Sequence, residues 1–129
     1  MAGYSSTPLP QKLGIKPGSI VHILGEPRAE LPFVATSAAP PADVLLAFVT
    51  REAELDLPTW GAAIRKDGVL WVCWPKKTAR KQVPSDMTED LVRAQALPLG
   101  LVDNKVCAID EVWSGLRLVW RVALRGTPR

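Results

Sequence analysis

The chain has 129 residues, of which 47% are hydrophobic and 22% are charged, and its formal net charge is +3. These values are typical of one globular domain with a core of its own, so they exclude a disordered chain. The mild positive charge permits contact with nucleic acid or with acidic partners, but it does not require either.

The sequence also argues against several classes of site and location. It contains no run of about 20 apolar residues, so we expect no membrane contact. The first residues lack the apolar core of a signal peptide, which together with two cysteines in apolar runs predicts a cytoplasmic protein. His22 is the only histidine, and the spacing Cys-x-x-Cys is absent. We therefore predict no metal, no cofactor and no catalytic residues.

In the first part of the chain, residues 6–15 predict a short helix that Thr7 caps and that ends at Gly14. This helix and the turn after it make up residues 1–18. Strands are expected at residues 20–24, 31–35 and 44–49, where Pro32 places the second strand at a sheet edge. The third is a continuous apolar run, which is typical of a strand buried on both faces.

In the second part of the chain, the expected strands alternate with helices. A helix is expected after Thr50, with a break at Pro58, and a second one begins at Thr88. The expected strands cover residues 69–74, 105–109 and 116–122, with a polar loop at 76–85, a hairpin loop at 110–115 and a frayed tail at 124–129. Strands that alternate with helices predict one domain over residues 1–129. Its expected fold is a three-layer Rossmann-like α/β fold, with a mostly parallel sheet and a C-terminal antiparallel hairpin.

Residues 42–76 (ADVLLAFVTREAELDLPTWGAAIRKDGVLWVCWPK) resemble the second half of a Rossmann-like methyltransferase. In that fold a glycine-rich turn after the first strand binds the cofactor, and an acidic residue ends the second strand. Here the turn is Gly25-Glu26-Pro27-Arg28, and the later position reads Ala35-Thr36-Ser37. The resemblance therefore implies a methyltransferase-like scaffold that has lost its cofactor site.

A second resemblance spans nearly the whole chain. The sequence resembles a family of small bacterial proteins that is catalogued only as a domain of unknown function. The resemblance implies a Rossmann-like fold and a cytoplasmic location, and it implies no activity. The residues that carry it are Gly3-Tyr4-Ser5, Thr7-Pro8-Leu9, Lys12-Leu13-Gly14-Ile15, Trp74-Pro75-Lys76-Lys77, Thr88-Glu89-Asp90 and the stretch PLGLVDNKVCAIDEVWSGLR at 98–117.

The basic loop that follows Trp74 is the main candidate site. Lys76, Lys77, Arg80 and Lys81 come directly after a predicted central strand, and ligands of open α/β sheets bind at the carboxyl ends of strands. One reading is an anion clamp that also uses the N–H groups at the start of the Thr88 helix. The other is a solvated loop that only aids solubility.

Two further candidates lie near the C-terminal hairpin. Asn104, between Asp103 and Lys105, belongs either to a polar site at the sheet end or to a turn. Trp113 is expected in the hairpin loop, where it either contacts a ligand or partner or folds over the sheet edge.

These residues support two hypotheses for function. The first is a non-catalytic binding or regulatory module whose partner, an unknown protein or a nucleic acid, meets the basic loop and Trp113. The second is a small-ligand protein or enzyme that holds a nucleotide or another anion in the cleft at the strand ends. A deep pocket lined by Trp74, Lys76 and Asn104 favours the second hypothesis, whereas a flat surface favours a protein partner.

Overall fold

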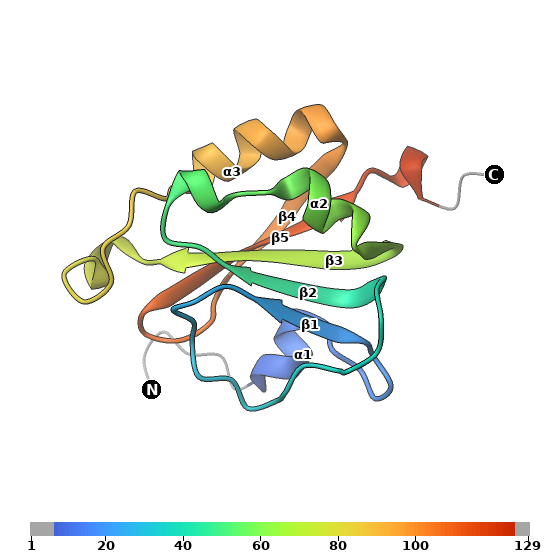
Figure 1. The fold of residues 1–129 in the computed structure, drawn as a ribbon, viewed down its shortest axis with the longest axis horizontal. Helices are drawn as coiled ribbons and strands as arrows, with labels where there is room; N and C mark the ends of the chain where they lie inside the picture. The colour runs from blue at the N-terminus through green and yellow to red at the C-terminus, as the bar shows by residue number, and fades with distance from the viewer. Residues whose placement is uncertain (1–6, 126–129) are drawn as a thin grey trace.

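The fold is built on one five-stranded sheet, which a computed structural model describes over residues 7–125 (Figure 1). The strand order across the sheet is β1-β2-β3-β5-β4, so the last strand in sequence lies inside the sheet. The bounds are Val21–Leu24 for β1, Ala42–Phe48 for β2, Ile64–Pro75 for β3, Leu101–Ala108 for β4 and Trp113–Trp120 for β5.

The prediction of a three-layer Rossmann-like fold with a mostly parallel sheet is wrong. The strand β2 pairs in parallel with both β1 and β3, whereas β5 is antiparallel to both β3 and β4, so the sheet is mixed. The connection from β1 to β2 contains no helix. In the described chain, the only helix on one face of the sheet is the short helix α1 (Leu9–Leu13). A Rossmann-like layer of crossover helices is therefore missing.

The strand predicted at residues 31–35 is also absent, and this segment is a loop. The loop continues along the outer edge of β1, where the Thr36 N–H donates to the Val21 carbonyl at 2.7 Å. The Thr36 hydroxyl in turn accepts a hydrogen bond from the Val21 N–H at 3.0 Å. Thr36 therefore satisfies both backbone groups of Val21 on this edge of β1.

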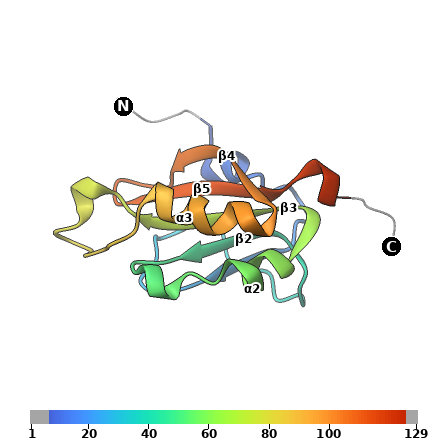
Figure 2. The same ribbon diagram turned by 90° about the horizontal axis from the view of Figure 1, so that it is seen from above.

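The opposite face carries α2 (Leu57–Ala62) and α3 (Glu89–Ala96), as Figure 2 shows. As predicted, Thr88 caps α3, because its hydroxyl accepts from the Leu91 N–H at 3.2 Å. The helix predicted after Thr50 is reduced to the 3₁₀ segment η1 (Glu52–Glu54). The helix α2 then begins next to Pro58, which occupies its first turn, where proline is tolerated.

Several element boundaries differ from those expected. Strands β3, β4 and β5 each begin earlier than predicted, and Pro8 rather than Thr7 is the N-cap of α1. Three more 3₁₀ segments follow, namely η2 (Lys77–Ala79), η3 (Leu97–Leu99) and η4 (Val122–Leu124). Of the tail expected to fray, residues 126–129 lie outside the described residues, as do residues 1–6 with Gly3-Tyr4-Ser5.

Two apolar clusters make up the core, one on each face of the sheet. Trp71 and Trp74 belong to different clusters, because residues three apart on a strand point to opposite faces. The Trp71 indole donates to the Leu13 carbonyl at 2.9 Å and so fastens α1 to β3. The Trp120 indole donates to the Gly61 carbonyl at 3.2 Å and fastens α2 on the other face.

The two cysteines are free, and β5 lies between the strands that carry them. Cys73 on β3 and Cys107 on β4 are both paired in register with Gly115 of β5. Two strand spacings are about 9–10 Å, which is too far for a disulfide.

No helix within residues 7–125 combines the length and the apolar character needed to cross a membrane.

Candidate functional site

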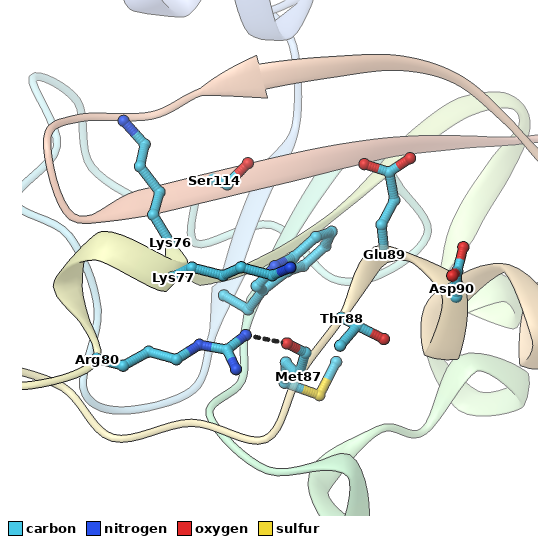
Figure 3. Close-up of a pocket in the computed structure, with 9 residues that line it drawn as sticks. Lys76, Lys77, Arg80, Met87, Thr88, Glu89, Asp90 and Ser114 are labelled. Atoms are coloured by element: carbon cyan, nitrogen blue, oxygen red, sulfur yellow. Dashed lines mark hydrogen bonds between the residues drawn. The ribbon is translucent and has the colours of Figure 1, made fainter.

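A pocket of about 450 Å³ lies between the loop that follows β3 and the start of α3 (Figure 3). Its position at the carboxyl end of a central strand is the one predicted for a ligand site. The residues that line it are Trp74, Lys76, Lys77, Arg80, Met87, Thr88, Glu89, Asp90 and Ser114.

Local backbone bonds position the basic side chains. The Lys76 N–H donates to the Val112 carbonyl at 2.8 Å, which ties the start of the loop to the β4–β5 hairpin. The chain then turns through η2, whose Ala79 is buried and anchors the loop. In Figure 3 the side chains of Lys77 and Arg80 extend in the same direction across the pocket, whereas Lys76 points away from them.

Arg80 joins the two ends of the loop. Its guanidinium donates to the Met87 carbonyl, seen as the dashed line in Figure 3. Its Nε atom is buried and has no hydrogen-bond partner among the described residues. Arg80 therefore holds the basic loop against the segment that leads into α3.

The acidic side chains of the pocket are already paired. Arg93, one turn into α3, forms ion pairs with Glu89, with Asp90 at 3.4 Å and with Asp103 of β4 at 2.9 Å. The hydrogen bonds with Asp103 and Glu89 raise the pKa of Arg93, so its charge is permanent. Within residues 7–125 no carboxylate pairs with Lys76, Lys77 or Arg80. No described carboxylate therefore neutralises the basic wall of the pocket.

Of the six predicted site residues, the structure gathers Trp74, Lys76, Lys77 and Arg80 in this pocket, and it places two elsewhere. Asn104 lies on β4, where the strand register shifts between Asp103 and Lys105, and its side-chain oxygen accepts from Arg117 at 3.3 Å.

The second residue outside the pocket is Trp113, which belongs to the core. It is only 3% exposed, and its ring meets that of Phe48 edge-on, with 5.1 Å between the centroids. The hairpin loop is shorter than expected because Asp110 accepts hydrogen bonds from the N–H groups of Val112 at 2.8 Å and Trp113 at 2.7 Å. The strand β5 thus starts at Trp113 itself, and a contact between this ring and a partner would require the core to open.

Sequence reasoning missed Ser114 in the pocket. Ser114 pairs in register with Trp74, and it lies two residues before Leu116, which is buried on the same face. The period-2 alternation of a strand that began at residue 113 would have identified it.

The turn at Gly25, where a methyltransferase would hold its cofactor, is closed by its own side chains. Arg28 pairs with Glu26 at 2.9 Å and also donates to the Gly25 carbonyl at 2.8 Å. Gly25 has φ +96°, and a Cβ atom there would lie 2.0 Å from the Phe48 carbonyl oxygen. The glycine therefore serves the close approach of β1 to β2.

Comparison of the chain with models of known protein families and with curated proteins gives no match. The resemblance to the uncharacterised bacterial family therefore stays a prediction.

Proposed function

We propose that this protein is a non-catalytic binding protein that takes a small anionic ligand in the pocket at the end of β3. One observation carries the proposal: Lys76, Lys77 and Arg80 border a pocket of about 450 Å³ and have no carboxylate partner in the described chain. Volumes of roughly 300–1,000 Å³ are usual for small-molecule sites.

The chemistry of the lining favours a phosphate or carboxylate group over a nucleobase. Lysine and arginine offer only donors, and charge-assisted hydrogen bonds to anions are about twice as strong as neutral ones. Ser114 adds a hydroxyl on the opposite strand. Trp74 is 6% exposed, so it offers almost no ring surface on which a base could stack. The anionic group is therefore the part of the ligand that the pocket recognises.

A binding role fits the positions of the histidine and cysteine side chains, which are the groups that most often act in catalysis. His22 lies on β1 and its Nε2 atom is 2.8 Å from the Ala38 carbonyl oxygen, away from the pocket. Cys73 is fully buried in the cluster on the α1 side, where burial first, then Cys107 and Asp110, raises the pKa of its thiol. Neither side chain is among the described residues that line the pocket.

The concave shape of the pocket favours a small ligand over a protein partner at this position. The hypothesis of a protein partner used Trp113 as an aromatic contact, and this ring is buried. A cytoplasmic location is part of the same proposal. It is supported by two free thiols that flank Gly115 at a separation no disulfide spans.

The test is thermal unfolding with inorganic phosphate, pyrophosphate, AMP, cyclic AMP and a short single-stranded DNA. A ligand at 100 times its Kd stabilises the folded state by about 2.7 kcal/mol. For a chain of this length that is a rise in Tm of roughly 10 °C.

Lys77→Ala removes an exposed cation of the pocket and should abolish most of this rise. Lys66→Ala, an exposed lysine at the start of β3, is the matched control and should leave it unchanged. A rise that Lys77→Ala leaves intact, or no rise with any probe, contradicts the proposal. If only DNA binds, and Lys76→Ala with Lys77→Ala lowers the salt dependence, the ligand is a nucleic acid instead.

A further inference from the structure

We propose that a groove between α1 and the outer edge of β4 binds an extended, acidic segment of a partner protein. This groove, called the β4 groove below, is lined by residues of α1 and β4. Figure 1 shows α1 on the side of the sheet opposite α3. The volume of the groove is about 520 Å³. The described residues that line it are Thr7, Gln11, Lys12, Lys105, Val106, Cys107 and Ala108.

The backbone of β4 forms one wall of the groove. The strand β4 is at the end of the sheet order and pairs only with β5, so within residues 7–125 its outer edge has no strand partner. The other end of the sheet is different, because the loop that contains Thr36 and Ala38 bonds to β1. Among the described residues, β4 is therefore the sheet edge that is more open to a further strand.

The geometry of β4 limits where a strand can add. The register shift between Asp103 and Lys105 interrupts the first part of the strand. From Lys105 to Ala108 the pairing with β5 is regular. These four residues are the part of β4 that lines the groove. The Ile109 N–H bonds to the Trp113 carbonyl, so by strand alternation Val106 and Ala108 are the residues whose backbone groups face outward beside α1.

The groove recognises a backbone rather than a compact ligand. Val106 pairs with Leu116, whose side chain is buried on the α2–α3 face, so the Val106 side chain points away from α1. Val106 therefore contributes its backbone to the groove, while its side chain is 49% exposed on the other face. An added strand would cover this exposed valine and pair with the backbone at the same time.

The charges of the groove select an acidic occupant. Lys12 on α1 and Lys105 on β4 face the groove from its two walls, and the described lining contains no carboxylate. Lys105 is exposed and has no ion pair in the described chain, and Lys12 makes only a 3.5 Å hydrogen bond, to the Ala108 carbonyl. Two unneutralised cations beside an open strand edge favour a partner whose alternate side chains are acidic.

The probe is a blocked octapeptide of alternating glutamate and valine, with the lysine–valine octapeptide as its charge control. Titration into the ¹⁵N-labelled protein should shift the amide signals of residues 105–108 and of Gln11 and Lys12. The double variant Lys12→Glu with Lys105→Glu should weaken this binding at least about tenfold and should admit the lysine–valine peptide. Lys105 is exposed and Lys12 is half-buried, and a thermal melt checks that the variant folds.

The matched control is Lys66→Glu, which reverses an exposed lysine on β3 and should leave the affinity unchanged. The proposal is overturned if neither peptide shifts these signals, if the shifts map to the pocket beside Lys77, or if charge reversal has no effect. It is also overturned if sedimentation shows a dimer that Lys105→Glu dissociates, because the occupant is then a second copy of this chain.

Discussion

Replacing Gly25 by alanine should lower the free energy of unfolding far more than the same change at Gly18. Both glycines have positive φ, +96° and +85°, so alanine has a similar backbone cost of about 1 kcal/mol at either position. The surroundings differ. A Cβ at Gly18 meets nothing within 4 Å, whereas one at Gly25 would lie 2.0 Å from the Phe48 carbonyl oxygen.

The difference in free energy of unfolding between the two variants measures the cost of the steric clash alone. Carbon–oxygen contacts below about 3 Å are forbidden, so β1 and β2 must separate by about 1 Å in Gly25→Ala. Overpacking of this kind costs about 1–3 kcal/mol, and here the obstacle is backbone, which cannot rotate away. We therefore expect a loss of about 3 kcal/mol or more for Gly25→Ala, against about 1 kcal/mol for Gly18→Ala.

Urea denaturation of both variants at 25 °C provides the assay, with the m value checked for two-state unfolding. In thermal melts the gap should be roughly 8 °C or more at this chain length. Equal losses would show that Gly25 is not held by its contact with β2. The turn would then have room for a side chain, and the strand-packing role given to this glycine would be refuted.

Three more variants test the core. Trp71→Phe removes the hydrogen bond to the Leu13 carbonyl and should cost about 2–3 kcal/mol in urea denaturation, with α1 losing its protection from amide exchange first. Trp113→Ala should cost about 3–5 kcal/mol, because the ring packs on Phe48 inside the core, and a surface residue would cost about 0.5 kcal/mol. The buried Cys73 thiol, with its raised pKa, should resist a thiol reagent at pH 8 until the protein unfolds. Above about pH 8.5 the unfolded chain loses this proton and the folded chain keeps it, so stability should fall by about 1.4 kcal/mol per pH unit, and less steeply in Cys73→Ala.

Local signals in the sequence predicted the parts of the fold that depend on neighbouring residues. Thr88 caps a helix because its hydroxyl reaches a backbone N–H three residues away. The apolar run in β2 is buried on both faces, and Trp71 and Trp74 point to opposite sides of β3. Each of these follows from propensity or from the strand period alone.

The predictions that were wrong concern parts of the fold that depend on residues distant in the sequence. The segment at residues 31–35 is apolar enough for a strand, but Thr36 bonds to Val21 and the segment remains a loop along the edge of β1. The insertion of β5 between β3 and β4 replaces parallel pairing by antiparallel pairing. No local pattern predicts whether these strands pair in parallel or antiparallel, because the pairing depends on which strand packs against the free edge of which other strand.

The candidate site was predictable in part for the same reason. A basic loop directly after a buried strand pointed to Lys76, Lys77 and Arg80, and all three border one pocket. Asn104 is separated from them because β4 lies beyond β5. Trp113 joined the core because the turn around Asp110 is tighter than the sequence suggested.

The position of β5 has a consequence for how the chain is made. Because residues 113–120 lie between β3 and β4, these two strands stay without their shared neighbour until β5 has left the ribosome. This strand also brings residues to both core clusters, such as Leu116 on one face and Val119 on the other. The sheet therefore cannot close before β5 is made, and a product that stops before residue 113 exposes the unpaired edges of β3 and β4 to other chains.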